Sequence, residues 1–221
     1  MDNARFAAMV GEGAESLGVA MSPAGLDTLY RYFKELAHWN RKVNLISRNL
    51  SAQEIVEKHF IDCLAPLRLL GASDRLLDVG TGAGFPGLVC KIGAPAMTVH
   101  LIEPRLKRVS FLRQVIRLLG LDDVFVHNGR LGDGSVVENS AGTTCVISRA
   151  VMEIGEFLTC CERFTASSCR VIFMKGHAYE DELPIKVRRL HGFALKYIDE
   201  YRLPFSGSRR TLLVFQGEAD A

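Results

Sequence analysis

The segment from residue 75 to residue 87, RLLDVGTGAGFPG, constrains this chain more than any other. A short apolar run ends in Asp78 and is followed at once by glycines at positions 80, 82, 84 and 87. A run of this length suits a buried strand, and Pro86 can open a helix because its missing amide hydrogen needs no partner there. Strand, glycine turn and helix together predict a nucleotide-cofactor site in which the backbone approaches the ligand closely.

Two classes of cofactor are compatible with a glycine turn of this kind. The spacing from Gly82 to Gly87 fits the G-x-G-x-x-G of dinucleotide sites, but counting from Gly80, at the strand end, the sixth position is Phe85. Asp78 would also face a pyrophosphate with its own negative charge. S-adenosylmethionine has no phosphate and carries a sulfonium and an ammonium, so the pattern Asp-x-Gly-x-Gly-x-Gly favours it. Another nucleotide and a purely structural turn stay open on this segment alone.

Two patterns divide the chain. Residues 1–72 have apolar residues at helical spacing, with a Ser22-Pro23 helix start and a capping box from Ser51 to Glu54. From residue 73 strands and helices alternate, which predicts a parallel sheet covered on both faces. We therefore expect a helical N-terminal extension (1–72) packed on an α/β core (73–217), with a short tail (218–221).

The core has the pattern of a class I S-adenosylmethionine-dependent methyltransferase, a Rossmann-like fold. The expected strands are 75–79, 98–102, 124–128, 143–148, 170–174, 195–203 and 210–216, and the expected helices are 86–92, 106–119, 152–165 and 178–190. The last two strands are joined through residues 204–208, which are too few for a helical crossover. We therefore predict a seven-stranded, mostly parallel sheet that ends in an antiparallel hairpin.

Ligand contacts in such sheets come from the carboxyl ends of the strands. Glu103 follows the second expected strand, where a carboxylate can accept both hydroxyls of an adenosine ribose. The backbone after the third strand, at Leu131 and Gly132, is expected to line the adenine. The fourth and fifth strands end at Arg149 and Lys175. Each of these two cations alone is an ordinary surface charge, but the pair on the ligand edge favours a function.

The end of the fourth strand also limits the methyl acceptor. It has Ile147-Ser148-Arg149-Ala150 instead of the Asn-Pro-Pro-Tyr or Asp-Pro-Pro-Tyr that holds an exocyclic amine. Methylation of pyrimidine carbon 5 needs an exposed cysteine nucleophile, whereas Cys145 lies inside an apolar run and is expected to be a core thiol. Guanine N7 remains among the aromatic nitrogens. It has a free lone pair and no proton to lose, so its methylation needs positioning more than a general base.

These residues resemble the bacterial small-subunit ribosomal RNA guanine-N7 methyltransferases, formerly called glucose-inhibited division protein B. The resemblance runs from about Asn44 to Phe215. It rests on Asn44-Leu45-Ile46-Ser47, His59-x-x-Asp62, Asp78 to Gly87, Lys107-Arg108-x-x-Phe111-Leu112, Ser148-Arg149-Ala150, Lys175-Gly176 and Arg210-Thr211-Leu212-Leu213-Val214. The family implies methyl transfer from S-adenosylmethionine to N7 of a guanine in a loop of 16S ribosomal RNA, the 530 loop.

The resemblance also assigns roles to residues. Together with the turn itself, it implies cofactor contacts at Asp78, Gly80, Gly82, Phe85, Glu103, Leu131, Gly132 and Arg149. It implies contacts with RNA or the base from Arg130, Arg149, Lys175 and Arg210, of which Arg149, Lys175 and Arg210 are the expected catalytic set. Many members have a small residue and then Glu after the arginine that matches Arg130, whereas this chain has Leu131-Gly132. Adenine recognition is therefore expected from backbone alone.

Two further features stay open. His59 and Asp62 lie one helical turn apart, and they either close the cofactor site or pair locally. Basic residues cluster at 105–117, 186–189 and 202–210, where they either bind RNA phosphates or keep helix faces soluble.

Composition excludes several other classes. The chain has 221 residues, of which 48% are hydrophobic, but no apolar stretch of 18 residues, so we expect no membrane association. The N-terminus lacks a signal-peptide layout and the six cysteines lack metal-ligand spacing, which predicts a cytoplasmic protein without a metal. A net charge of +2 permits a nucleic-acid partner without requiring one. We expect a monomer that acts on ribosomal RNA or the 30S particle. The alternatives are a methyltransferase of another RNA or a small molecule, and a non-catalytic cofactor-binding module.

Overall fold

The structure, a computed structural model, describes residues 1–134, 142–149, 152–167, 169–176, 179 and 189–218. Its α-helices are α1 (Asn3–Ser16), α2 (Pro23–Asn40), α3 (Ala52–Ile55), α4 (Gly87–Gly93), α5 (Leu106–Leu119) and α7 (Ile154–Cys161). A π-helix η1 (Val56–Ile61) and two 3₁₀ helices, η2 (Asp62–Arg68) and η3 (Glu162–Ser167), complete the helical elements of the described part. No helix within these residues is both long enough and apolar enough to span a bilayer.

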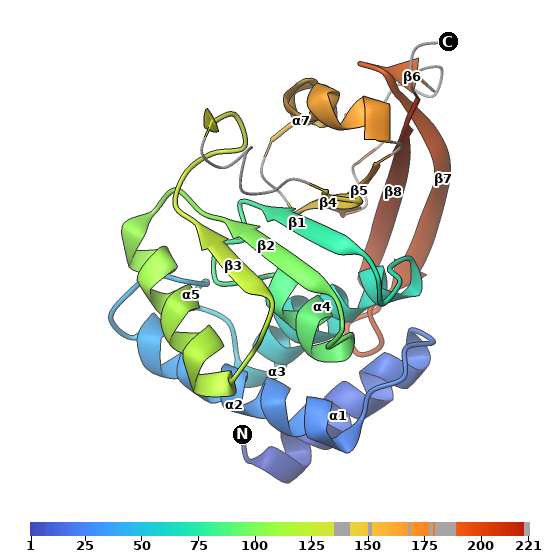
Figure 1. Cartoon of the computed structure of the whole chain (residues 1–221). Coiled ribbons are helices and arrows are strands. Elements are labelled where there is room, and N and C mark those ends of the chain that lie inside the picture. The colour runs from blue at the N-terminus through green and yellow to red at the C-terminus, as the bar shows by residue number, and fades with distance from the viewer. Residues whose placement is uncertain (135–141, 150–151, 168, 177–178, 180–188, 219–221) are drawn as a thin grey trace.

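One twisted sheet organises the molecule (Figure 1). Its strands are β1 (Arg75–Val79), β2 (Thr98–Ile102), β3 (Val124–His127), β4 (Cys145–Arg149), β5 (Arg170–Lys175), β6 (Arg189–Leu190), β7 (Phe193–Arg202) and β8 (Arg209–Gly217). The order across the sheet is β3-β2-β1-β4-β5-β8-β7-β6. Strands β1 to β5 run parallel to one another, whereas the pairs β5–β8, β8–β7 and β7–β6 are antiparallel. The predicted α/β architecture with a terminal antiparallel hairpin is therefore confirmed.

The expected elements differ from the structure by one or two residues at several ends, such as β4 and β7, and the predicted number of seven strands is wrong. The sheet has an eighth strand, β6, because Arg189 and Leu190 pair with the start of β7. The prediction that the last helix includes these two residues is wrong, and most of that predicted helix (178–190) lies outside the described residues. The predicted helix 152–165 is shorter, since its α-helical part covers only Ile154–Cys161 before a 3₁₀ segment begins.

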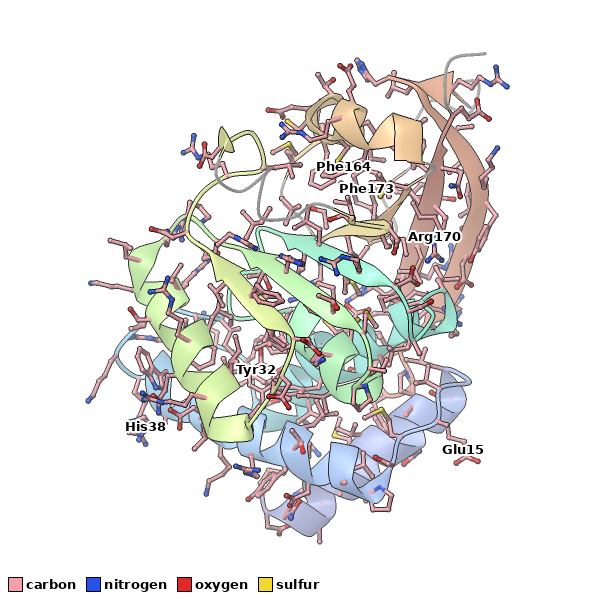
Figure 2. All side chains as sticks on the ribbon, in the orientation of Figure 1. Glu15, Tyr32, His38, Phe164, Arg170 and Phe173 are labelled. Atoms are coloured by element: carbon pink, nitrogen blue, oxygen red, sulfur yellow. The ribbon has the colours of Figure 1, made fainter. Side chains whose placement is uncertain are left out.

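Two apolar layers cover the sheet. On one face the helices α1, α2, α4 and α5 pack in a cluster that runs from Phe6 to Leu212, and on the other face α7 packs in a second cluster. Figure 2 shows Tyr32 on the side of the N-terminal helices and Phe173 on the side of α7. Residues from before and after residue 72 therefore share one core, and the division of the chain at that residue stays a prediction.

The segment from Ser51 to Arg68 connects the N-terminal helices to the sheet. The predicted capping box is confirmed, since Ser51 Oγ accepts from the amide of Glu54 and Glu54 Oε2 accepts from the amide of Ser51. After one turn of α-helix the chain widens into the π-helix η1 and then tightens into η2. Short π-helical segments occur frequently at functional sites, because they reorient side chains relative to a regular helix. Here the wide segment ends directly before Asp62.

Candidate functional site

The glycine turn, residues Gly80–Gly87, lies at the carboxyl end of β1. Gly80 and Gly82 have φ of +69° and +62°, in the left-handed region that side chains rarely adopt. A Cβ on Gly82 would meet no atom closer than 3.6 Å, whereas a Cβ on Gly84 would lie 2.5 Å from Leu88 and 2.8 Å from the Tyr32 hydroxyl. Gly84 therefore serves close packing, and Gly82 leaves bare backbone on the open side of the turn.

Asp78 holds the two ends of this turn together. Its Oδ2 accepts from the Thr81 hydroxyl at 2.6 Å and from the Gly87 amide at 2.8 Å. Its Oδ1 is buried and has no hydrogen-bond partner. Burial raises the pKa of Asp78 to about 6, against the lowering effect of these two hydrogen bonds. Asp78 therefore has a structural role in the turn, and its expected contact with the cofactor stays a prediction.

Glu103 faces the turn from the end of β2. Its carboxylate is 2% exposed, and it accepts from the Gly82 amide at 3.1 Å and from the Arg105 amide at 2.9 Å. The Arg108 guanidinium, on the first turn of α5, lies 3.7 Å from Glu103 Oε2. A carboxylate has about four acceptor positions. Glu103 therefore orders the turn through its amide contacts and retains capacity for further donors such as ribose hydroxyls.

The Phe85 side chain points from the turn into the hydrophobic core. Its ring stacks on Tyr32 with centroids 5.3 Å apart and packs against His59 at 5.2 Å. The Tyr32 hydroxyl donates to the carbonyl of Ala83 in the turn. The side chain of Phe85 is buried among aromatic residues of the N-terminal helices, and its expected contact with the cofactor stays a prediction. These helices therefore support the turn directly.

Arg149, the last residue of β4, extends toward the N-terminal helices. Its Nη1 donates to the carbonyl of Lys58 and its Nη2 to Nδ1 of His59, both at 2.9 Å. Its guanidinium carbon lies 5.6 Å from the centroid of the Phe85 ring, a cation–π distance. Burial, and then the positive charges of Arg149 and Lys58, lower the pKa of His59 to about 3. His59 is therefore a neutral acceptor that fixes the orientation of Arg149.

Asp62 brings the two expected catalytic arginines together. This side chain is 5% exposed, and its Oδ1 accepts from the Tyr201 hydroxyl at 2.8 Å. Its Oδ2 lies 3.4 Å from Arg210 Nε and 3.9 Å from Arg149 Nη1. Burial raises the pKa of Asp62, and the two arginines oppose that rise. His59 and Asp62 thus pair with distant strands instead of with each other.

Lys175, the third member of the expected catalytic set, lies on the other face of the sheet. Arg149 pairs in register with Met174, so Lys175 points to the opposite side, where its Nζ is 6.0 Å from the Phe173 ring and 3.4 Å from the carbonyl of Met152. Lys175 is nevertheless the last residue of β5, next to the end of β4. The three cations therefore share the carboxyl edge of the sheet, with Arg149 and Arg210 joined through Asp62. We call these three residues the cationic rim.

The loop after β3 carries the remaining expected contacts. Arg130 is exposed, and its amide donates to Asp133 Oδ2 at 2.7 Å. Leu131 is buried in the cluster on the α7 face, and a Cβ on Gly132 would meet no atom within 4 Å. Asp133 therefore orders this loop, and the backbone at Gly132 is open.

The structure also agrees with the exclusion of a cysteine nucleophile. Cys145 is fully buried in β4 and burial raises the pKa of its thiol, so the prediction of a core thiol is confirmed. Within the described residues, no group of three or more His, Cys, Asp or Glu side chains is arranged to hold a metal ion.

Sequence reasoning missed the connections around Asp62 and the position of Arg108. The one-turn spacing of His59 and Asp62 indicated a shared face, but their partners Arg149 and Arg210 are set by the topology of the sheet. Arg108 was interpreted only as one of several basic residues on a helix, whereas its Nη1 lies 3.6 Å from where a Cβ on Gly82 would stand.

Residues 26–212 match the GidB family, described as rRNA small subunit methyltransferase G. The chain belongs to this family. It is 40% identical over 206 residues to the ribosomal RNA small subunit methyltransferase G of Desulfotalea psychrophila, covering 92% of this chain and 95% of the relative. It is 36% identical over 221 residues to the protein of the same description from Myxococcus xanthus, covering 99% and 100%. The family resemblance inferred from the motifs is therefore confirmed.

Solved structures agree on the fold. The precorrin-6y C5,15-methyltransferase of Geobacter metallireducens has a TM-score of 0.53 at 11% identity, covering 77% of this chain and 92% of that one. M. jannaschii TYW2, solved in complex with AdoMet, has a TM-score of 0.57 at 15% identity, covering 78% and 80%. At such low identity these likenesses show the fold alone, and they place the chain among class I methyltransferase folds.

Proposed function

We propose that this protein transfers the methyl group of S-adenosylmethionine to N7 of a guanine in a loop of 16S small-subunit ribosomal RNA. The observation that carries the proposal is the convergence of Arg149 and Arg210 on the buried Asp62, beside the glycine turn. A cofactor-binding module would need the turn but not this arrangement. Membership of the rRNA small subunit methyltransferase G family supports the same reaction.

The residues of the glycine turn fit the cofactor. S-adenosylmethionine supplies an electrophilic methyl group on a sulfonium when bound. Its ammonium and sulfonium are cationic, which suits the negative charge of the Asp78 carboxylate beneath the turn. Its ribose hydroxyls are donors, which suits the Glu103 carboxylate 3.1 Å from the Gly82 amide. The bare backbone at Gly82 leaves space for close approach, and the open backbone at Gly132 suits an adenine ring.

The cationic rim fits a guanine in RNA. Methylation at N7 moves positive charge from the cofactor to the base, so a cation beside N7 would oppose the reaction. Arg149, Lys175 and Arg210 are therefore assigned to RNA phosphates and to O6, which is a common acceptor of arginine and lysine in guanine recognition. Asp62, between Arg149 and Arg210, offsets the positive charge that the rim would otherwise present to the methylated base.

The proposed partner is small-subunit ribosomal RNA, as naked RNA or in the 30S particle, with a monomeric enzyme acting in the cytoplasm. Exposed basic residues such as Arg130 suit phosphate contacts, which contribute affinity without sequence choice. The test uses labelled S-adenosylmethionine and small subunits from a strain that lacks this protein. Label in the 16S RNA, with strand cleavage chemistry that detects 7-methylguanosine in the 530 loop, is the expected result. Label at another atom or in another RNA would contradict the assignment.

A further inference from the structure

Guanine N7 does not by itself explain the choice of guanine. Adenine also has an N7 lone pair, so an enzyme that acts at N7 must distinguish the two purines elsewhere on the ring. Guanine presents O6 as an acceptor and N1–H and N2–H₂ as donors, whereas adenine presents a donor at N6 and an acceptor at N1. The cationic rim can read O6. Reading N1–H and N2–H₂ requires an acceptor, and a carboxylate is the strongest one a side chain offers.

A polar pocket of about 400 Å³ lies against the hairpin of β7 and β8. We call it the hairpin pocket, and its described lining is Tyr179, Glu200, Tyr201, Arg202, Arg209, Arg210 and Thr211. Three of these residues are arginines and one is a carboxylate. Glu200 is the one acidic side chain among these described lining residues, and a phosphate site does not explain it, because its carboxylate would repel the phosphate.

Glu200 occupies a defined place in this lining. In the sheet register Lys175 pairs with Thr211, and Thr211 pairs with Glu200, so these residues form a row across β5, β8 and β7 on one face. The Tyr179 hydroxyl is 3.2 Å from Glu200 Oε1, which orients the carboxylate. The side chain of Glu200 is exposed to solvent. A cation of the rim and this acceptor are therefore held at opposite ends of one cross-strand row.

The hairpin pocket connects to the glycine turn through Arg210, which alternates with Thr211 along β8 and so points to the opposite face of the sheet from Glu200. This residue lines the pocket and contacts Asp62, which also contacts Arg149, and Arg149 lies over Phe85 of the turn. Neighbouring strands are about 4.8 Å apart, so β7 lies three spacings, roughly 14 Å, from β4. Such a span accommodates a purine with a hydrogen bond of about 2.9 Å at one edge and an attack distance of about 3–3.5 Å at the other.

We propose that the hairpin pocket binds the Watson–Crick edge of the target guanine, with Glu200 accepting hydrogen bonds from N1–H and N2–H₂. N7 lies across the ring system from N2, so a base held in this way turns N7 toward β4 and the glycine turn. Proteins that recognise single-stranded RNA loops commonly splay a base out and bond this edge. The inference rests on the proposed function and adds to it the residue that selects guanine.

The test compares guanosine with inosine, which keeps N1–H and O6 but lacks the N2 amine, at the target position of reconstituted small subunits. We expect the wild-type protein to methylate guanosine with a kcat/KM about 10- to 100-fold above that of inosine, since one charge-assisted hydrogen bond is lost. Glu200→Gln should lose about 10- to 100-fold on guanosine and reduce the preference over inosine to less than about threefold. Its melting temperature and its affinity for S-adenosylmethionine should match the wild type.

A matched control distinguishes recognition from charge. Glu218→Gln makes the same change at the other end of the hairpin, where Glu218 pairs with Lys196, and should leave the guanosine-to-inosine ratio unchanged. A hairpin pocket that binds only phosphate predicts the opposite sign for Glu200→Gln: tighter RNA binding, because a negative charge is removed, with wild-type base preference. That result would overturn the inference and leave the proposed function standing. Failure of the wild-type protein to methylate either base would overturn both.

Discussion

The glycine turn and the cationic rim are built in opposite ways. In the turn, one short stretch folds on itself, and Asp78 reaches its Gly87 partner only nine residues away. In the rim, Arg210 and Asp62 are 148 residues apart and meet because the sheet and η2 bring them together. The turn is organised by backbone conformation and local hydrogen bonds, and the rim by side chains from separate elements.

We expect this difference to separate cofactor binding from methyl transfer. The turn is ordered mainly by contacts that do not involve Lys175 or Arg210, so loss of either of these two residues should leave cofactor binding intact. The rim depends on the N-terminal helices, since His59 and Asp62 supply partners for Arg149. Variants in the two regions should therefore have separable effects, with cofactor affinity as the readout for the turn and methyl transfer as the readout for the rim.

The largest expected effect is at Gly82. Gly82→Val should abolish binding of S-adenosylmethionine, because a side chain intrudes where bare backbone meets the ligand and because φ is +62°. Gly120→Val is the matched control, since Gly120 has φ of +64° and carries the same backbone strain at the end of α5, far from the turn. Calorimetry should detect binding by the control only. NAD should bind to neither variant nor to the wild type, since Asp78 opposes a pyrophosphate.

The next largest effects are expected at Lys175 and Arg210. Lys175→Ala and Arg210→Ala should each reduce methyl transfer on the order of 10²-fold, the size of effect that follows misplacement of a reacting group. Cofactor affinity should stay at the wild-type value in both, whereas Arg149→Ala should lower both readouts. Arg189→Ala, an exposed arginine on β6, controls for charge. Wild-type rates in both Lys175→Ala and Arg210→Ala would show that the rim has been assigned wrongly.

The same contrast explains what the sequence could predict. The boundaries of β1, β2 and α5 follow directly from local apolar runs and spacing, and the structure has them where the patterns place them. The face on which Lys175 lies depends on its register with Thr211, and the partners of Asp62 depend on chain topology, which no local pattern contains. Arg189 was expected in a helix, but edge pairing with Ala194 places it in a strand.

A smaller effect is expected at Glu103. Glu103→Gln keeps the shape of the side chain but replaces one acceptor oxygen with a donor, facing the Gly82 and Arg105 amides and the ribose. Cofactor affinity should fall by about 1.5–3 kcal/mol, the range for hydrogen bonds to charged groups. Titration calorimetry measures this directly, with Glu156→Gln on the surface of α7 as the control. An unchanged affinity would assign Glu103 to ordering the turn alone.

The ionisation of Asp78 should make cofactor affinity depend on pH. The cationic cofactor favours the ionised carboxylate, whose pKa burial raises to about 6 in the free protein. Affinity should therefore fall by up to tenfold per pH unit below about pH 6. The raised pKa has the opposite effect on the free energy of unfolding of the protein without cofactor. Protonated Asp78 contributes its full stabilisation below about pH 4, and this contribution is lost as the pH rises to about 6. Thermal shift on adding S-adenosylmethionine should thus grow between about pH 5 and 7, and Asp78→Asn should remove this trend.

The smallest expected effect is the pH dependence of methyl transfer itself with saturating cofactor. Guanine N7 has no proton to lose, so no group of the protein has to act as a general base. His59 is the one histidine among the contacts of the rim that the structure describes, and its pKa is lowered to about 3 by burial and by Arg149 and Lys58, so it stays neutral across the physiological range. Single-turnover rates should therefore be flat between about pH 6.5 and 8.5. His59→Gln retains an acceptor for Arg149 and should keep this flat pH profile. Its rate should be lower at every pH, because glutamine orients the arginine less well than histidine does. A wild-type rate that rises tenfold per pH unit, together with a flat profile in His59→Gln, would identify His59 as a general base. The rim would then be a proton-transfer site and not a positioning site.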